Sequence, residues 1–186
     1  MKLFVFCGPS GSGKTTIVHH LLKNHNQLSF SVSATTRNKR ANETDGVDYY
    51  FITPDAFRNK IMHDEFLEWE MVYQDRYYGS LKSEAERIYK SGRYALFDVD
   101  VEGGLKIKSI YGDNVMAVFV RPPTLEILHQ RLINRNTETD ESLKKRIEKS
   151  DYEWTFAEKF DRIIINDSLE EACNEAMQIV NDFLSR

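Results

Sequence analysis

The stretch that decides the fold is residues 8–15, Gly8-Pro9-Ser10-Gly11-Ser12-Gly13-Lys14-Thr15. It matches the pattern G-x-x-x-x-G-K-[ST] at every fixed position. The glycines let backbone N–H groups curl around an anion without a Cβ in the way, and a helix that follows points its positive end at the same place. The sequence therefore predicts a loop that binds the phosphates of a nucleotide.

The residues on both sides of this loop supply the context that the pattern requires. Leu3 to Cys7 form a continuous apolar run, typical of a strand buried on both faces. From Lys14 onward, apolar residues recur at helical spacing as far as Leu22. The chain thus opens as strand, glycine loop and helix, a context that favours a real phosphate site over a chance match.

Further apolar strands and helical patterns alternate along the rest of the chain. We expect strands at 94–99, 115–120 and 162–166, and helices at 103–110, after Thr124, at 142–159 and at 168–184. This alternation predicts an α/β fold in which helices cover both faces of a parallel sheet. Between the first helix and the second strand the alternation breaks, and short strand patterns surround one helix that Thr53 caps.

We therefore predict a single domain, residues 1–186, with three parts. The core comprises 1–32, 81–133 and 147–186, a small mixed-β lobe occupies 33–80, and a helical lid lies at about 134–146. The composition agrees with an ordinary globular protein, since hydrophobic residues make up 41% and charged residues 29% of the chain.

Charge and cysteine content exclude several classes of function. The net charge of −4 gives no global reason to expect a nucleic-acid or anionic-membrane partner. Cys7 and Cys173 stand alone without metal-ligand spacing, which argues against a disulfide framework and a zinc site and favours the cytoplasm. The apolar run at 3–7 is too short for a signal peptide or a membrane span.

Several longer segments, taken in order, carry a resemblance. They are Ser33-Ala34-Thr35-Thr36-Arg37-Asn38-Lys39-Arg40, Gly46-Val47-Asp48-Tyr49, Phe66-Leu67-Glu68-Trp69, Tyr77-Tyr78-Gly79-Ser80, Asp98-Val99-Asp100-Val101-Glu102-Gly103 and Ile165-Asn166-Asp167. Together they resemble the guanylate kinases over essentially the whole chain. The resemblance implies a P-loop NTPase-type fold, ATP as phosphoryl donor, Mg²⁺ as cofactor, and GMP or dGMP as acceptor.

The resemblance also implies roles for single residues. Those that would hold the phosphate of GMP are Arg37, Arg40, Tyr49 and Tyr78. Those that would read its guanine are Ser33, Glu68, Ser80 and Asp100. ATP would be bound by Gly8, Pro9, Ser10, Gly11, Ser12, Gly13, Lys14, Thr15, Thr16 and Asn166. The catalytic cations would be Lys14, Arg131, Arg135 and Arg146, and Mg²⁺ would be held by Thr15 and, through water, by Asp98.

Guanine chemistry agrees with the role of Glu68. One edge of guanine presents the N1–H and N2–H₂ donors, and a single carboxylate can accept from both. Adenine has no such pair, so a buried Glu68 would be left unpaired against AMP. Without the family resemblance, Glu68 is better read as a solvated acid, and Arg37 and Arg40 as surface cations. Asp98 ends an apolar strand, where P-loop proteins usually place a metal-handling carboxylate, and this position favours that role over a solvated strand end.

Four positions depart from the usual family pattern, and none removes a group with an assigned contact. They are Lys39 in place of Pro, Asn42 in place of Gly, Glu102 in place of Gln, and Asn136 in place of a common Gly in the lid. Three other functions stay open: a kinase for another small phosphate, a peptide-binding module, and a nucleotide sensor. The intact phosphate loop favours the enzyme over the module. We expect small nucleotides as partners, and a monomer or homodimer.

Overall fold

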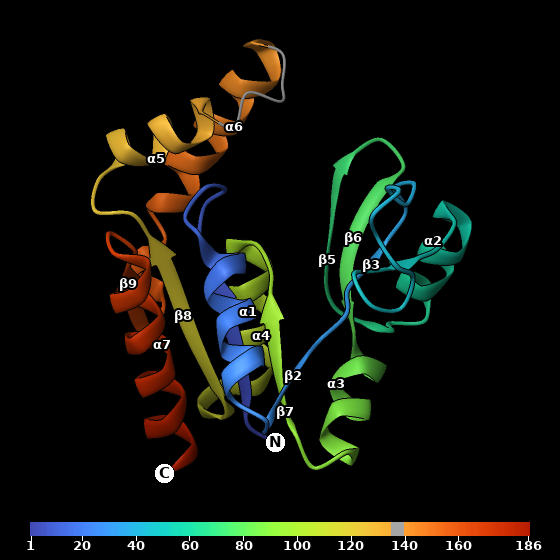
Figure 1. Cartoon of the computed structure of the whole chain (residues 1–186). Coiled ribbons are helices and arrows are strands. Elements are labelled where there is room, and N and C mark those ends of the chain that lie inside the picture. The colour runs from blue at the N-terminus through green and yellow to red at the C-terminus, as the bar shows by residue number, and fades with distance from the viewer. Residues whose placement is uncertain (135–139) are drawn as a thin grey trace.

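The computed structural model describes residues 1–134 and 140–186, apart from the side chains of Asp140 and Ser142 (Figure 1). A five-stranded parallel sheet forms its centre. In sheet order, the strands are β2 (Leu28–Phe30), β7 (Tyr94–Asp98), β1 (Leu3–Cys7), β8 (Val115–Arg121) and β9 (Arg162–Ile165). The connecting helices are α1 (Lys14–Asn24), α3 (Lys82–Lys90), α4 (Val101–Tyr111), α5 (Leu125–Ile133), α6 (Asp140–Trp154) and α7 (Leu169–Leu184).

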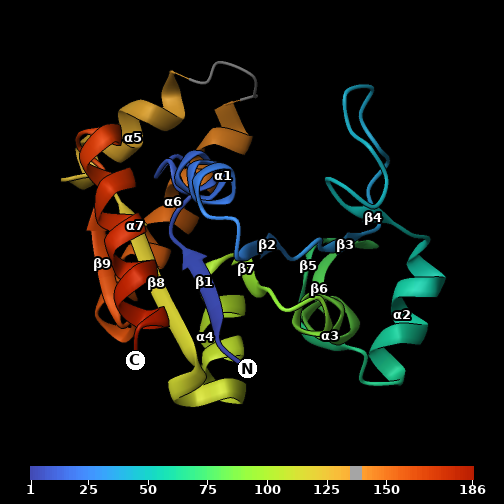
Figure 2. The same cartoon turned by 60° about the horizontal axis from the view of Figure 1, so that its bottom comes forward.

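Helices cover both faces of this sheet, as the apolar strand patterns predicted. Helices α1 and α7 lie on one face and α4 on the other (Figure 2). Along β1, Phe4 and Phe6 pack on the side of α1 and α7, while the alternate residues pack on the side of α3 and α4. Every residue of β1 is buried. Truncating a buried phenylalanine such as Phe4 to alanine costs about 3–5 kcal/mol of stability, so the strand that carries the loop is firmly anchored. The α/β prediction is confirmed.

A second sheet stands apart from the first and has four strands (Figure 1). Their order is β4 (Tyr50–Phe51), β3 (Ala34–Thr35), β6 (Arg76–Leu81) and β5 (Phe66–Tyr73). The pairing of β3 with β4 is parallel and the other pairings are antiparallel, so the sheet is mixed. Helix α2 (Pro54–Met62) covers it, and Phe57 of this helix stacks against Phe66 and Tyr77. The lobe thus has an apolar core of its own.

Three elements differ from the sequence-based expectation. Strand β2 was not expected as a fifth strand of the core sheet, but Leu28 packs into the core and the strand pairs with β7. Helix α3 was not predicted at all. The helix expected at 142–159 ends at Trp154, and a 3₁₀ turn follows at Ala157–Lys159, where Ala157 and Phe160 turn into the core.

Within the described parts of the chain, no helix combines the length and the apolar character needed to cross a membrane.

Candidate active site

Backbone geometry builds the phosphate loop between β1 and α1. Gly13, the N-cap of α1, has φ +88°, a conformation that side chains with a Cβ rarely adopt. A Cβ on Gly13 would also lie 2.1 Å from Nδ2 of Asn166. That amide donates a hydrogen bond of 2.7 Å to the carbonyl of Ser12. Asn166, which follows β9, therefore braces the loop from behind and requires glycine at position 13.

The first turn of α1 meets the end of β7. The ammonium of Lys14 lies 3.1 Å from Oδ1 of Asp98, and the Thr15 hydroxyl donates to Oδ2 of the same carboxylate at 2.7 Å. They meet because β1 and β7 are neighbours in register, with Phe6 opposite Asp98. Burial alone would lower the pKa of Lys14, but the charge of Asp98, its hydrogen bond and the other acidic groups nearby together outweigh burial and raise the pKa above its usual value. Lys14 therefore stays charged at neutral pH.

Thr15 and Asp98 fit the ligand preferences of Mg²⁺. A hydroxyl and a carboxylate are hard oxygen donors, and they stand side by side at the opening of α1. Magnesium in nucleotide sites takes one or two protein oxygens and completes its shell with water and phosphate oxygens. These two side chains can supply that protein share.

Two cavities meet at this point. The loop cavity, of about 700 Å³, is lined by every residue from Gly8 to Thr16 together with groups of β5 and α6. The lobe cavity, of about 830 Å³, extends toward the second sheet. Lys14, Thr15 and Arg146 line both cavities. Two ligands lying one in each cavity would therefore bring their phosphates together beside the same cations.

Six of the eight predicted acceptor-binding residues line the lobe cavity: they are Ser33, Arg40, Tyr49, Glu68, Tyr78 and Asp100. Arg37 lies just behind this lining. Its guanidinium donates two hydrogen bonds to Glu43, at 2.6 and 2.5 Å, and stands 5.0 Å from the centre of the Tyr49 ring. Arg37, through its hydrogen bond, holds the pKa of Glu43 down to about 2. The cluster has the donors needed to grip a phosphate.

Of the predicted base-reading residues, Ser33, Glu68 and Asp100 line the lobe cavity, whereas Ser80 is buried next to Glu68. Glu68 of β5 is opposite Ser80 of β6 and is 7% exposed. Burial, together with the negative charge of Asp100, raises the pKa of Glu68 to about 7. The Ser80 hydroxyl is fully buried next to the Glu68 carboxylate. Buried polar groups in such a pair are suited to recognising a ligand edge, because leaving them unpaired is costly.

The lid arginines are placed as follows. Arg131 of α5 donates to the carbonyl of Asn166 at 3.0 Å, close behind the loop. Arg146 of α6 lines both cavities. Arg135 and Asn136 lie outside the described residues.

Sequence reasoning missed four charged residues of this site, which are Glu43, Glu70, Lys149 and Glu153. Glu43 received no role, although its spacing from Arg40 suits a salt bridge. Lys149 and Glu153 follow Arg146 at helical spacing, so they share a face with a residue already singled out. Glu70 lies two residues after Glu68 on β5, and this spacing indicates that both side chains face the same side of the strand.

Comparison with known proteins decides the family. Residues 1–183 match the family model described as guanylate kinase. The chain belongs to the guanylate kinase family. It is therefore a phosphotransferase of P-loop type, as the resemblance implied.

Relatives within the guanylate kinase family are similar over most of their length. A guanylate kinase of Bacteroides fragilis is 48% identical over 183 residues, which is 98% of this chain and 90% of the relative. One from Porphyromonas gingivalis is 42% identical and covers 100% of this chain and 99% of the relative. A solved guanylate kinase of Anaplasma phagocytophilum shares the fold, with a TM-score of 0.75 at 24% identity over 97% of this chain and 85% of that one.

Proposed function

We propose that this protein transfers a phosphoryl group from ATP to GMP or dGMP by direct in-line displacement. The observation that carries the proposal is the meeting of two cavities at Lys14, Thr15 and Arg146. ATP would occupy the loop cavity and the acceptor the lobe cavity. Their phosphates would then approach each other beside cations that face both.

The acceptor brings its own nucleophile. A phosphate monoester has a second pKa of about 6, so the GMP phosphate is a dianion near neutral pH and needs no strong general base. The tasks left to the protein are alignment of the reacting groups and neutralisation of charge. Arg37 and Arg40 would hold the acceptor phosphate through charge-assisted hydrogen bonds, and Glu43 keeps Arg37 oriented.

On the donor side, the loop N–H groups and Lys14 would bind the ATP phosphates. Magnesium, when bound by Thr15 and by Asp98 through water, would neutralise charge on the donor phosphates. Arg131 and Arg146 would stabilise charge on the transferred group, with Arg135 assigned the same role from the family pattern. We expect closure over the site to exclude water and so suppress hydrolysis of ATP.

Selection of guanine would rest on Glu68, supported by Ser33, Ser80 and Asp100. Ionised Glu68 accepts from both donors of the guanine edge, whereas adenine would leave the buried carboxylate unpaired. This chemistry favours a guanine nucleotide over the other small phosphates considered as acceptors.

The deciding experiment measures ADP production from ATP and Mg²⁺ with GMP, dGMP, AMP, CMP or UMP as acceptor, alongside a control without acceptor. We expect fast turnover with GMP and dGMP alone. Binding of GMP and ATP without turnover would instead indicate a nucleotide sensor, and turnover with a different acceptor would refute the assignment of guanine reading. Absence of both nucleotide binding and turnover would favour the peptide-binding module.

A further inference from the structure

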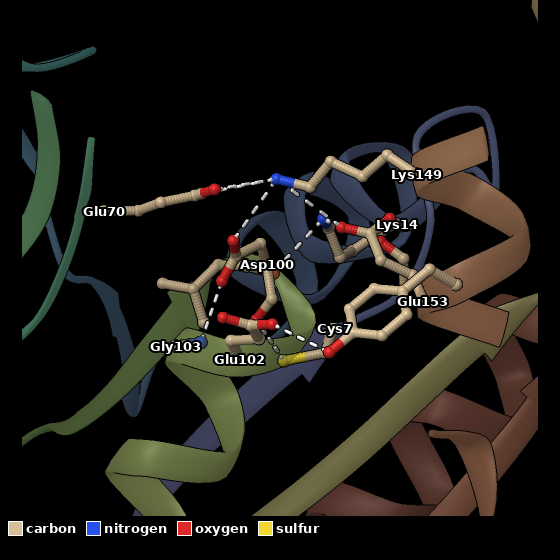
Figure 3. Close-up of polar contacts among 11 residues, drawn as sticks. Cys7, Lys14, Glu70, Asp100, Glu102, Gly103, Lys149 and Glu153 are labelled. Carbon is tan, nitrogen blue, oxygen red and sulfur yellow. Dashed lines mark hydrogen bonds and ion pairs between the residues drawn. The ribbon is translucent and has the colours of Figure 1, made fainter. Parts of the chain in front are cut away.

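A cluster of opposite charges lies where the two cavities meet, and its centre is Lys149 (Figure 3). This lysine projects from α6 toward β5 of the lobe. Its ammonium lies 3.1 and 3.3 Å from the two carboxylate oxygens of Glu70, 3.7 Å from Oδ2 of Asp100 and 3.9 Å from Oε1 of Glu153. The Lys149 side chain thus connects α6 with β5 of the lobe and with the turn between β7 and α4.

Two of the three partners of Lys149 line both cavities. Glu70 and Asp100 each line the loop cavity and the lobe cavity, and Lys149 itself lines the loop cavity. Glu153 is 6% exposed and lies on the same helix as Lys149, one turn further on. The ammonium therefore stands beside the boundary that a transferred phosphoryl group would cross.

The charge balance of this cluster makes Lys149 hard to replace. Three carboxyl groups approach the Lys149 ammonium, and burial raises the pKa of Glu70 and brings that of Glu153 to about 7. Removing the lysine would therefore leave these groups either protonated or facing one another with like charge, in a partly buried place. Repulsion between the ionised carboxylates would push Glu70 and Asp100 apart. Without Lys149, these side chains would also be attracted toward other cations such as Lys14. The direction of both side chains therefore depends on Lys149.

Asp100 is the partner through which this dependence reaches the acceptor. Its Oδ1 accepts the Gly103 N–H at 2.8 Å and so caps α4, while its Oδ2 faces Lys149. The helix cap and the lysine together fix the carboxylate from two sides. Asp100 also lines the lobe cavity beside Glu68, where we place the guanine.

We propose that Lys149 is a positioning residue of the acceptor site, which holds Asp100 and Glu70 in the orientation that GMP binding requires. The inference rests on the proposed function, because it takes Asp100 as a reader of guanine. Lys149 acts here through the carboxylates and not on the reacting phosphates. Its loss should consequently weaken acceptor binding selectively.

The test is steady-state kinetics of Lys149→Met, which keeps most of the aliphatic stem and removes the charge. We expect KM for GMP to rise about tenfold, while kcat and KM for ATP change by less than about twofold. Lys149→Arg should restore KM for GMP to within about threefold of the wild type, since it returns the charge. Lys144→Met, at an exposed position of the same helix, is the matched control and should leave all three constants unchanged.

A double-mutant cycle with Glu70→Gln completes the test. Glu70→Gln should also raise KM for GMP, and the double variant with Lys149→Met should be no worse than the poorer single variant, because both act through one contact. An unchanged KM for GMP in Lys149→Met, or equal rises for GMP and ATP, would overturn the inference. So would a fall in kcat alone, which would place Lys149 on the reacting phosphates.

The outcomes also separate this inference from the proposed function. A wild-type protein that does not phosphorylate GMP would overturn both. A wild-type protein that phosphorylates GMP, with a Lys149→Met variant of the same KM for GMP, would overturn the inference alone. Thermal unfolding of each variant without nucleotide would verify that the kinetic change does not come from loss of folded protein.

Discussion

The ammonium of Lys14, at the start of α1, and the carboxylate of Asp98, at the end of β7, lie 3.1 Å apart. Asp98 also accepts a hydrogen bond from the Thr15 hydroxyl, so one carboxylate orients both residues that we propose to bind the donor phosphates. We expect Lys14→Ala to lower kcat by on the order of a thousandfold, because it removes a charge aimed at the transferred group. ADP production measures this, with Lys23→Ala at the exposed end of α1 as control. Near-normal turnover would exclude Lys14 from catalysis.

Glu68→Gln tests the guanine-reading role. The amide keeps the size of the side chain but presents a donor where guanine needs an acceptor. We expect the ratio of kcat/KM for GMP over AMP to fall at least about tenfold. Glu65→Gln, whose carboxylate pairs with Lys60 outside the cavity, should keep the ratio. Unchanged discrimination in Glu68→Gln would remove Glu68 from the guanine site.

The raised pKa of Glu68 predicts a pH dependence of acceptor binding. With a pKa of about 7 in the folded protein, the carboxylate is mostly protonated at about pH 6 and mostly ionised at about pH 8. Guanine needs the ionised form, so the dissociation constant for GMP should fall several-fold to about tenfold as pH rises through this range. Isothermal titration calorimetry without ATP measures it.

The GMP phosphate titrates near the lower end of the same range, since its second pKa is about 6. Glu68→Gln separates the two effects, because the variant keeps only the contribution of the phosphate. The same slope in wild type and variant would contradict the assignment of the titration to Glu68.

Arg37→Ala tests the phosphate grip. The variant removes a guanidinium that Glu43 holds in place, and charge-assisted hydrogen bonds contribute about 1.5–3 kcal/mol each. KM for GMP should therefore rise by about tenfold to a hundredfold, with KM for ATP much less affected. Arg58→Ala, an exposed arginine of the lobe that pairs with Asp55 and Asp75, is the control. Equal KM values for GMP in the two variants would refute the grip.

Gly13→Ala tests the brace behind the loop, and Gly92→Ala is its matched control. Both glycines have positive φ, at +88° and +74°, so alanine costs about 1 kcal/mol of strain at either place. Only at position 13 does the new Cβ also meet Asn166, whereas nothing lies within 4 Å at position 92. Urea unfolding should show the larger loss for Gly13→Ala, accompanied by a raised KM for ATP. Equal losses in both variants would contradict the brace.

Much of the fold followed from local patterns. The apolar run at 3–7, the glycine loop and the helical spacing after Lys14 are contiguous in sequence, and their structure depends on neighbours along the chain. Strand β2 was not predicted because it is only three residues long. Its burial depends on pairing with β7, where Leu28 lies opposite Tyr94, more than sixty residues away in the sequence. Helix α3 is short and begins without a side-chain cap, so its start carried no signal.

The site divides in the same way. Residue type and spacing alone predicted the phosphate loop, with Lys14 and Thr15 at the start of the helix that follows it. They could do so because backbone conformation and helix polarity act over a few residues. Only the tertiary structure decided that Glu43 holds Arg37, that burial brings the pKa of Glu68 to about 7, and that Lys149 joins α6 to Glu70 and Asp100. Burial and long-range charge pairing depend on which distant segments meet, and that is set by packing of the whole chain.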